Sequence, residues 1–212
     1  MNAPMSGRKA EAARNDRLIA EAARSVFVAE PSAPIAAVAE AAGVGISALY
    51  RRYPSKEDLL RKVCADGLET YTSIVRAAVE DTEGDPWEVF ETFMRRVVEA
   101  DTHSITVALA GTFTPTQELN AAAENSGLLN VELMERTKKA GVIRPDVVHA
   151  DLGVIFEQLA AVHEGDARRD NELRQRYLTL ILDGLRLPPT TTPLPGEAPT
   201  LEERGRRWIP KG

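Results

Sequence analysis

Residues 39–60 read AEAAGVGISALYRRYPSKEDLL, and no other stretch of the 212-residue chain says as much about its fold. The alanine-rich residues before Gly43 predict a short helix, because Gly43 stands where helices commonly end in a residue that tolerates a positive φ. A second short helix is predicted to follow within a few residues and to stop at Pro54. Two short helices joined by so tight a turn indicate a helix-turn-helix, which places its second helix in the major groove of DNA.

The second helix has two faces of different chemistry when its residues are placed at about 100° each. The face that we expect to pack inside the domain carries Ile46, Leu49, Tyr50 and Tyr53. The opposite face, which we expect to be free to contact DNA, carries Ser47, Ala48, Arg51 and Arg52.

The helix after Pro54 begins with strong capping signals. Ser55 is the expected N-cap, and Glu57 and Asp58 place negative charge in the first turn, where the helix dipole favours it. Lys56 adds a cation to the exposed N–H groups of the same terminus, and this combination suits a phosphate.

Residues 43–48, GVGISA, also fit the dinucleotide-binding pattern G-x-G-x-x-A. That pattern requires a β-strand before the first glycine and a βαβ unit around it. The preceding residues 36–42, AAVAEAA, favour a helix instead. The nucleotide-binding interpretation is therefore set aside.

Three segments resemble the TetR family of one-component bacterial transcriptional regulators, and the resemblance runs from about Asn15 to Leu60. Residues 17–27, RLIAEAARSVF, are similar to the family's first helix, and residues 38–44, VAEAAGV, to its second helix and turn. Residues 49–60, LYRRYPSKEDLL, are similar to its recognition helix and to the start of the fourth helix. The run Leu-Tyr-x-x-aromatic-x-Ser-Lys is the most specific part of this match.

The sequence departs from the family pattern in three places. Gly45 stands where the family usually has a capping serine, so the recognition helix is expected to start less firmly, by a few tenths of a kcal/mol. The loop between Phe27 and Ile35 is short and lacks the usual glycine. Ala33 and Pro34 replace threonines that commonly touch phosphate, which leaves Ser32 as the nearby donor.

The resemblance implies an all-α fold, in which an N-terminal three-helix DNA-binding domain with a helix-turn-helix precedes a helical ligand-binding and dimerisation domain of about six helices. Four parts are expected along the chain. They are a basic N-terminal arm (1–14), the helix-turn-helix domain (15–54), the ligand-binding and dimerisation domain (55–187) and a proline-rich, disordered tail (188–212).

The formal charge of −6 is divided unevenly along the chain. Residues 1–62 hold ten Lys and Arg against seven Asp and Glu, a net of +3, and the remainder holds sixteen against twenty-five, a net of −9. Positive charge is thus concentrated where phosphates would be met. Arg8, Lys9, Arg14 and Arg17 belong to the arm, which we expect to be loose in solution and to order along a groove.

The remainder of the chain has the apolar spacing of helices throughout. Expected starts are Ser55, for a helix to about Glu80, and Asp85-Pro86, an N-cap followed by proline at N1. Further expected elements are an apolar segment from Ile105 to Ala110, a helix from the capping box Thr114-Pro115-Thr116-Gln117 to about Ala140, a helix from Arg144-Pro145-Asp146 and a last helix from near Asp170.

Apolar residues surround most of the last two helices, and this predicts a second buried surface beyond a single core. We therefore expect a homodimer, which the resemblance also implies, although the interior of a monomer is the alternative. The expected interface residues are Val154, Ile155, Leu159, Val162, Leu178, Ile181, Leu182 and Leu185.

The sequence has no recognisable catalytic motif, metal-ligand cluster or cofactor signature, so neither an enzyme nor a bound cofactor is expected. Its single cysteine, Cys64, is predicted to be a small core residue. A cavity for a small apolar or aromatic effector is more plausible than an active site. Its expected lining is Phe90, Phe93, Met94, Val97, His103, Thr106, Leu109, Phe113, Leu128 and Phe156.

These patterns predict a cytoplasmic protein, without a membrane span or signal peptide, that binds double-stranded operator DNA as a homodimer. The resemblance implies that it is a transcriptional regulator that acts as a repressor on a pseudo-palindromic operator and is released by a small molecule. Expected base contacts are Ser47, Ala48 and Arg51, expected phosphate contacts are Tyr50, Arg52 and Lys56, and Ser32, Gly45 and Ile46 complete the DNA-binding set. Two alternatives stay open: a helical small-molecule binder or enzyme that does not use the helix-turn-helix on specific DNA, and a sequence-tolerant nucleoid protein.

Overall fold

The computed structural model describes residues 7–187 and 192–209, which form ten helices and no named strand. The N-terminal helices are α1 (Gly7–Ala29), α2 (Ile35–Ala41) and α3 (Ile46–Arg52). The remaining helices are α4 (Lys56–Glu80), α5 (Pro86–Glu99), α6 (Thr102–Leu109), α7 (Gln117–Lys139), α8 (His149–Ala160), α9 (Ala167–Leu185) and α10 (Leu201–Arg206). The predicted all-α class, with three N-terminal helices before a larger helical domain, is confirmed.

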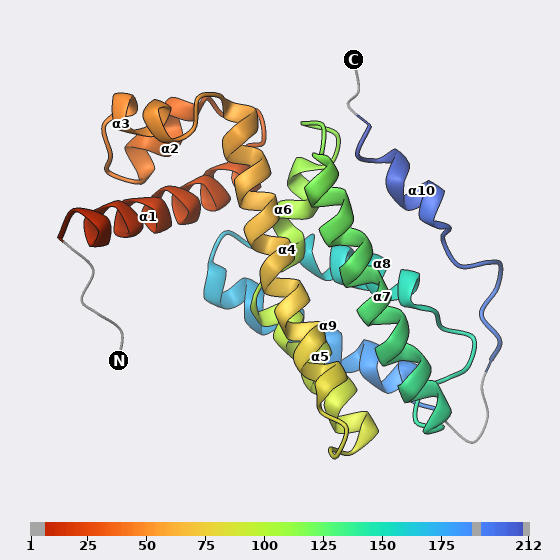
Figure 1. The fold of residues 1–212 in the computed structure, drawn as a ribbon. Helices are drawn as coiled ribbons and strands as arrows, with labels where there is room; N and C mark the ends of the chain where they lie inside the picture. The colour runs from red at the N-terminus through yellow and green to blue at the C-terminus, as the bar shows by residue number, and fades with distance from the viewer. Residues whose placement is uncertain (1–6, 188–191, 210–212) are drawn as a thin grey trace.

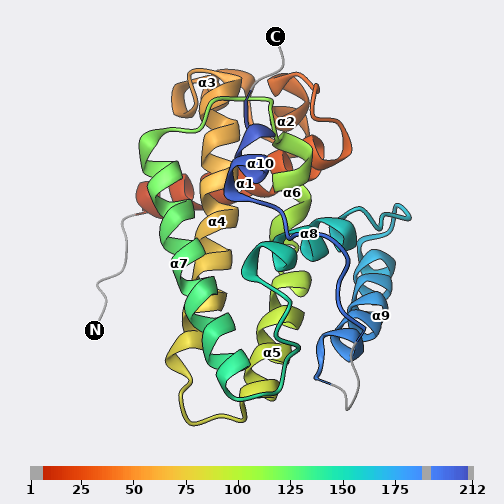
Figure 2. The same cartoon turned by 90° about the vertical axis from the view of Figure 1, so that its right-hand side faces the viewer.

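Helix α4 joins the two parts of the molecule (Figure 1). Its first turns lie beside α1–α3, and the rest of the helix runs along α5 and α7 in the larger domain. Figure 2 shows α10 in front of the space between α7 and α6, although it follows α9 in the sequence. No helix in the described part of the chain has the length and apolar character needed to cross a membrane.

The N-terminal core is shared between the two parts of the molecule. Phe27, Val38 and Leu49 from α1–α3 pack in one buried cluster with Ile105 and Leu109 of α6. The cluster removes these side chains from water, which is the main driving force for joining the two parts. The small domain is therefore not an independent unit on a flexible linker.

Helix α3 follows the predicted division into faces only in part. Leu49 and Tyr53 are buried, as expected. Ile46 and Tyr50 were expected to pack, but they are 40% and 47% exposed, so this half of the prediction is wrong. A helix of only seven residues has too few turns to bury a broad apolar stripe.

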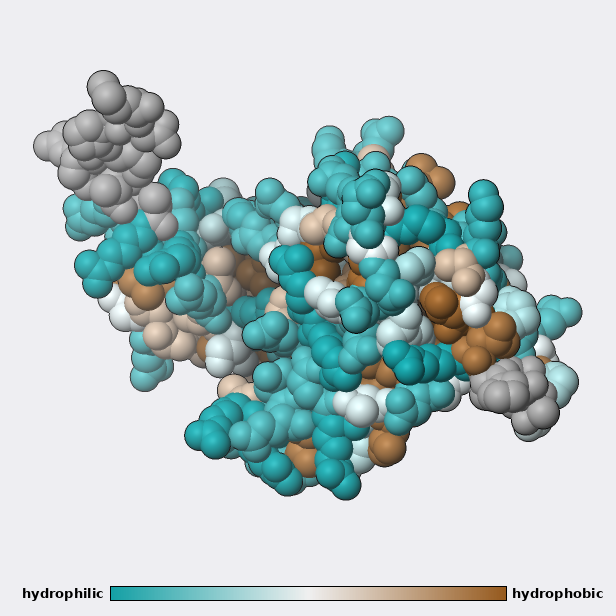
Figure 3. Space-filling model, turned by 90° about the horizontal axis from the view of Figure 1, so that it is seen from below, coloured by the Kyte–Doolittle hydropathy of each residue, from teal (hydrophilic) through white to brown (hydrophobic). Residues whose placement is uncertain are grey.

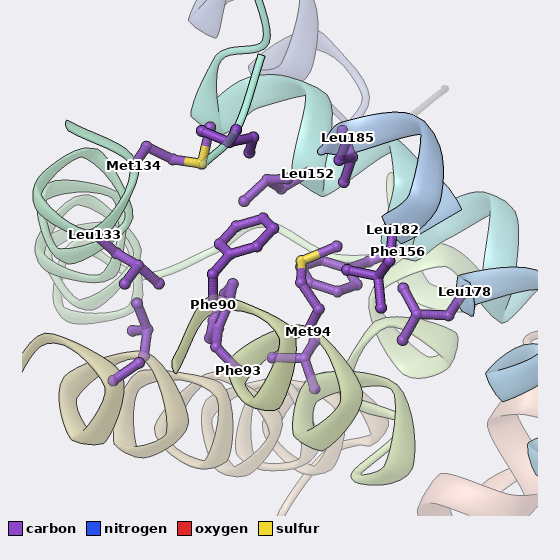
Figure 4. Packing of buried hydrophobic residues seen from close by; sticks show 14 of the residues in the cluster. Phe90, Phe93, Met94, Leu133, Met134, Leu152, Phe156, Leu178, Leu182 and Leu185 are labelled. Atoms are coloured by element: carbon purple, nitrogen blue, oxygen red, sulfur yellow. The ribbon is translucent and has the colours of Figure 1, made fainter. Parts of the chain in front are cut away.

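The core of the larger domain is filled by side chains from α4, α5, α7, α8 and α9. Figure 4 shows its centre, in which aromatic, aliphatic and methionine side chains from several helices point toward one another. The labelled members are Phe90, Phe93, Met94, Leu133, Met134, Leu152, Phe156, Leu178, Leu182 and Leu185.

Two predicted helix starts are confirmed by their caps, and two are wrong. Ser55 caps α4 by accepting from Asp58 N, and Asp85 caps α5 before Pro86. Helix α7 is capped by Thr116 and not by Thr114, so that Pro115 precedes the helix. Helix α8 begins at His149, because residues 145–146 form a turn.

The turn before α8 has its own electrostatic explanation. Arg144 Nε and Nη2 donate to the two carboxylate oxygens of Asp146 at 2.7 and 2.9 Å, which holds the chain in a bend between the two residues. These hydrogen bonds are the largest of the effects that lower the pKa of Asp146. The capping role expected for this segment passes to Asp151, whose carboxylate accepts from Val148 N.

Both ends of the chain are more ordered than expected. Helix α1 begins at Gly7, so the predicted loose arm is helical over 7–14, while residues 1–6 lie outside the described part. In the predicted disordered tail, residues 192–209 are described and include α10, whereas 188–191 and 210–212 lie outside the description. Viewed from below, the molecular surface is mainly hydrophilic, with small separate apolar patches (Figure 3).

Candidate nucleic-acid interface and effector cavity

The turn between α2 and α3 is built on two glycines. Gly43 has φ 65°, the left-handed conformation expected at this helix end. Gly45 is the N-cap of α3 and offers no side-chain cap, so the helix starts on backbone hydrogen bonds from Ala48 N and Leu49 N to Gly45 O (2.8 and 3.1 Å). The missing side-chain cap is as the sequence predicts, and the weaker start of this helix remains a prediction.

The outward face of α3 presents polar, aromatic and cationic groups together. Ser47, Tyr50 and Arg51 are exposed, and Leu49 between them is fully buried and fixes the helix on the core. This face has the hydroxyl, phenol and guanidinium groups that bind base edges and phosphates. Exposed Ile46 adds an apolar side chain of the kind that contacts a thymine methyl group.

Two of the predicted DNA contacts are partly engaged with α1. The Arg52 guanidinium pairs with the carboxylate of Asp16. Ala48 is half-buried and lies with Asp16 and Ile19 in a recess between α3 and α1. Arg51, by contrast, is exposed at the edge of the same recess.

Lys56 is tied to the loop between α1 and α2. Its Nζ donates to Pro31 O at 3.0 Å and to Ala33 O at 2.7 Å, and it lies 5.1 Å from the centre of the Phe27 ring. Burial lowers the pKa of this lysine. Lys56 therefore holds the loop that carries Ser32, whose hydroxyl donates to the carboxylate of Glu30.

A cavity of about 370 Å³ lies between α4, α6, α7, α8 and α10. Its wall contains small residues at the points where helices approach it, among them Gly67, Ala123, Gly127 and Gly153. Small side chains leave space that larger ones would fill. The cavity differs in this respect from the core of the larger domain, where large side chains pack together. A volume of this size suits a small ring-containing molecule.

The polar groups of the cavity form a short hydrogen-bonded chain. Tyr71 Oη donates to Asn130 Oδ1 at 2.8 Å, and Asn130 Nδ2 donates to Ser126 O at 2.9 Å. The Ser126 hydroxyl is buried and has no hydrogen-bond partner. An unpaired buried hydroxyl costs free energy, so a ligand that formed a hydrogen bond with it would recover this free energy on binding.

His103 lies in the cavity wall between aromatic rings. Its ring centre is 5.3 Å from that of Tyr71 and 4.9 Å from that of Phe156. Burial lowers the pKa of His103 to about 4, so the imidazole is neutral at physiological pH. Cys64, also in the wall, has its pKa raised to about 12 by burial and is unreactive as a thiolate at neutral pH.

Only two of the residues expected to line the cavity do so, namely His103 and Thr106. Five others fill the core of the larger domain: Phe90, Phe93, Met94, Val97 and Phe156. Leu109 and Phe113 belong to the N-terminal cluster, and Leu128 is 70% exposed on the outer side of α7. The structure therefore moves the candidate cavity away from the aromatic core, towards α7, α8 and α10.

The tail helix is the part of the site that the sequence reading missed. Arg204, Arg207 and Trp208 all line the cavity. Thr200 and Glu203 form a capping box with reciprocal hydrogen bonds at the start of α10. This T-x-x-E pattern was visible in the sequence, but it stood in a proline-rich segment.

The residues expected at a dimer interface also divide into two groups. Leu159, Leu178, Leu182 and Leu185 are buried within the single chain. Val154, Ile155, Val162 and Ile181 are half-buried. The exposed apolar side chains of α9 are instead Tyr177 and Leu180.

A helix-turn-helix joined by one continuous helix to a helical domain with a cavity defines a one-component DNA-binding regulator. The family model of bacterial regulatory proteins of the tetR family matches residues 19–63, and that of the C-terminal domain of SbtR-like transcriptional regulators matches residues 85–187. The chain therefore belongs to the TetR family of transcriptional regulators, which are DNA-binding transcription factors and not enzymes.

The chain is also similar to individual members of the family. The HTH-type transcriptional repressor LfrR of Mycolicibacterium smegmatis is 36% identical over 87 residues, which span 41% of this chain and 43% of that repressor. A TetR transcription regulatory protein of Mycobacterium vanbaalenii is 27% identical with a TM-score of 0.56, over 84% of this chain and 99% of the other. The structure of LfrR in complex with proflavine is similar in fold, at 22% identity and a TM-score of 0.57, over 78% of this chain and 95% of that one.

Proposed function

We propose that the protein is a ligand-released repressor that binds a pseudo-palindromic operator as a homodimer. The observation that carries the proposal is the outward face of α3, on which Tyr50 and Arg51 stand free while Leu49 anchors the helix. Membership of the TetR family supports the DNA partner, and the partial match to a named repressor supports the direction of regulation. We place its action in the cytoplasm, where bacterial operator DNA is found.

The proposed dimer face lies on α9. Leu173, Tyr177, Leu180 and Gly184 recur at helical spacing, and Leu180 is 64% exposed. An apolar stripe of this kind on a helix that already buries its other side fits an isologous contact with a second copy. Two copies are also needed because one short recognition helix reads few bases.

The proposed effector is a small molecule that enters the cavity of the larger domain. The cavity volume of about 370 Å³ and the unpaired hydroxyl of Ser126 support this assignment. The structure of LfrR with proflavine is a precedent for a small aromatic ligand in a protein of similar fold.

Helix α4 provides the route from the cavity to DNA. Its 25 residues correspond to about 37 Å of helix, with Lys56 at one end and the cavity residues Gly67 and Tyr71 further along. A tilt forced by a ligand at the cavity displaces the start of α4 and the α3 unit packed on it. Two recognition helices must lie about 34–36 Å apart to enter successive major grooves, so a shift of a few ångströms weakens both contacts.

The proposal is tested by titrating salt into complexes of the protein with its own upstream DNA and with random DNA of equal length. Repressor function predicts an affinity for the specific site at least about 1000-fold greater than for random DNA, together with a steep salt dependence. Equal affinity for both DNAs would instead identify a sequence-tolerant DNA protein. No binding to either would favour a small-molecule binder that does not use its helix-turn-helix.

Release by the effector adds a thermodynamic condition. A ligand that binds the DNA-free form about 100-fold more tightly, a difference of about 2.7 kcal/mol, reduces operator occupancy, and operator DNA must weaken the ligand by the same factor. Calorimetry of an effector with and without operator measures both factors. Unchanged ligand affinity in the presence of operator contradicts release through this cavity.

A further inference from the structure

The tail helix α10 and its C-cap form one wall of the cavity and contribute all of the guanidinium groups among its described lining residues. Figure 2 shows the tail running upwards past α8 and ending with α10 in front of the space between α7 and α6. Arg204 comes from this helix, Arg207 is its C-cap, and Trp208 follows Arg207. The cavity is therefore closed by a segment of the chain's own C-terminal region.

Arg204 of α10 and its C-cap Arg207 meet a single acidic group. Glu157 on α8 is the only carboxylate among the described residues that line the cavity. Arg204 Nη1 donates to Glu157 Oε2 at 2.9 Å, and Arg207 Nη1 pairs with Glu157 Oε1. The Glu157 side chain is only 16% exposed, so this carboxylate depends on its two partners for charge compensation.

Two cations on one carboxylate leave Glu157 strongly ionised. Burial acts to raise the pKa of Glu157, but the hydrogen bonds from Arg204 and Arg207 outweigh it and lower the pKa. If α10 leaves, the carboxylate on α8 loses both arginine partners and lies beside the neutral ring of His103. A cation is the ligand that restores its charge balance.

The attachment of the tail suits a reversible contact. We call the described tail, residues 192–209, the strap. Before α10 it is held by two exposed hydrogen bonds: Arg144 Nη2 donates to Thr192 O at 2.7 Å, and Leu194 N donates to Asp146 Oδ2 at 3.0 Å. Helix α10 has six residues, which is too short to persist as a helix away from its docking site. The strap can therefore undock without disturbing the packed core of α4–α9.

Undocking of the strap also removes a contact with the buried cluster of the DNA-binding part. Trp208 stacks edge-on against Phe113, with ring centres 5.9 Å apart. Phe113 belongs to the same buried cluster as Phe27 and Leu49, which position α3. Loss of Trp208 removes support from this cluster at the end of α6, and α6 itself contacts α1.

We propose that Arg204 and Arg207 of the tail hold the Glu157 carboxylate in the wall of the effector cavity, and that the effector which displaces them is an organic cation that pairs with Glu157. This proposal rests on the proposed function and names the chemical class of the effector. In the structure, Arg204 and Arg207 pair with the Glu157 carboxylate. The effector places an aromatic body among Tyr71, His103 and Leu119 and its positive group at Glu157.

The test uses two probes of nearly equal shape, the permanent cation N-methylacridinium and uncharged acridine, titrated by calorimetry at pH 8 without DNA. The variants are the full chain, a chain lacking residues 192–212, the double variant Arg204→Ala/Arg207→Ala, and Glu157→Gln in the shortened chain. Arg206→Ala is the matched control, because Arg206 is exposed and pairs with Glu202 away from the cavity. Since no DNA is present, failure here is distinct from failure of operator binding.

We expect removal of the strap, or of both arginines, to strengthen N-methylacridinium binding at least 10-fold and acridine binding less than 3-fold, with Arg206→Ala unchanged. Glu157→Gln in the shortened chain should remove most of the preference for the cation. The double variant keeps the test valid if the shortened chain does not fold. Unchanged cation affinity in the double variant, or equal affinity of the shortened chain for both probes, overturns the proposal. The proposal is also overturned if the full chain binds the anion anilinonaphthalene sulfonate tightly and the double variant does not. In that case Arg204 and Arg207 would bind an anionic ligand in the cavity.

Discussion

Arg174 on α9 lies 2.8 Å from the carboxylate of Asp101, in the turn that joins α5 to α6. The same turn binds the DNA-binding part, because Arg24 of α1 donates to Ala100 O at 3.1 Å. Asp101 has φ 48°, a left-handed conformation that places its carboxylate against α9 while its backbone faces α1. This turn therefore joins the helix proposed for dimerisation to α1, the first helix of the DNA-binding part.

Loss of the Arg174 guanidinium should destabilise the fold. The side chain is 7% exposed and also donates to Val162 O and Ala160 O, the free carbonyls at the end of α8. Arg174→Leu is expected to lower the free energy of unfolding by about 3 kcal/mol, because it leaves these acceptors and Asp101 without their donor. Urea denaturation measures the change. The exposed neighbour Arg176→Leu should stay within about 0.5 kcal/mol of the parent, and equal losses in both variants would contradict this assignment.

The two cations of the DNA-binding face should behave differently. Arg51→Ala is expected to relax sequence preference at one position in each half-site, at a cost of about 1–3 kcal/mol per contact. Lys56→Ala should weaken all sequences alike and flatten the salt dependence, because Lys56 is expected to neutralise a phosphate and reads no base. Binding of a set of operator variants to each protein separates the two effects. Identical profiles would show that Arg51 does not read a base.

The proposed dimer face can be tested with two leucines of similar exposure. Leu180 is 64% exposed on α9 and Leu128 is 70% exposed on α7. Leu180→Asp should give a folded monomer in sedimentation, because a carboxylate at a buried seam opposes association by several kcal/mol per dimer. Leu128→Asp should remain dimeric. A dimeric Leu180→Asp protein would remove α9 from the interface.

Stability should fall in mild acid through His103. Its pKa is lowered to about 4 by burial, so between pH 6.5 and pH 4 the unfolded chain binds the proton more readily than the folded chain. The contribution of His103 is complete above pH 6.5 and decreases as the pH falls, by about 2 kcal/mol at pH 5. Urea denaturation at pH 7.5 and pH 5 should show this loss in the parent and a smaller one in His103→Gln. Equal losses in both proteins would mean that other groups cause it.

Features that depend on neighbouring residues within one helix or turn could be predicted from the sequence. Ser55 and Asp85 cap the helices that they were expected to cap, and Gly43 has the positive φ expected of it. These features depend on a few neighbouring residues and on strong local preferences. The helix-turn-helix is of this kind, and it was predicted correctly except for the exposure of Ile46 and Tyr50.

Features that depend on several helices at once could not be predicted in the same way. The periodic aromatic residues of α5 indicated apolar surroundings, but periodicity does not distinguish a packed core from a cavity wall. The cavity is set by small residues on different helices, such as Gly67 and Gly153, whose meeting the sequence does not reveal. The tail was missed because its proline content outweighed the local capping signal at Thr200.

The strap also has a consequence for the order in which the protein is made. Its contacts reach far back along the chain, since Arg204 binds Glu157, 47 positions earlier, and Trp208 stacks on Phe113. Chains fold from the N-terminal side during synthesis, so most of the larger domain can begin to pack before the strap leaves the ribosome. Under the proposal above, an effector present during synthesis would reach the cavity before α10 has docked, whereas one that arrives later would have to compete with α10. The proposal therefore predicts that the speed of the response depends on when the effector arrives as well as on its concentration.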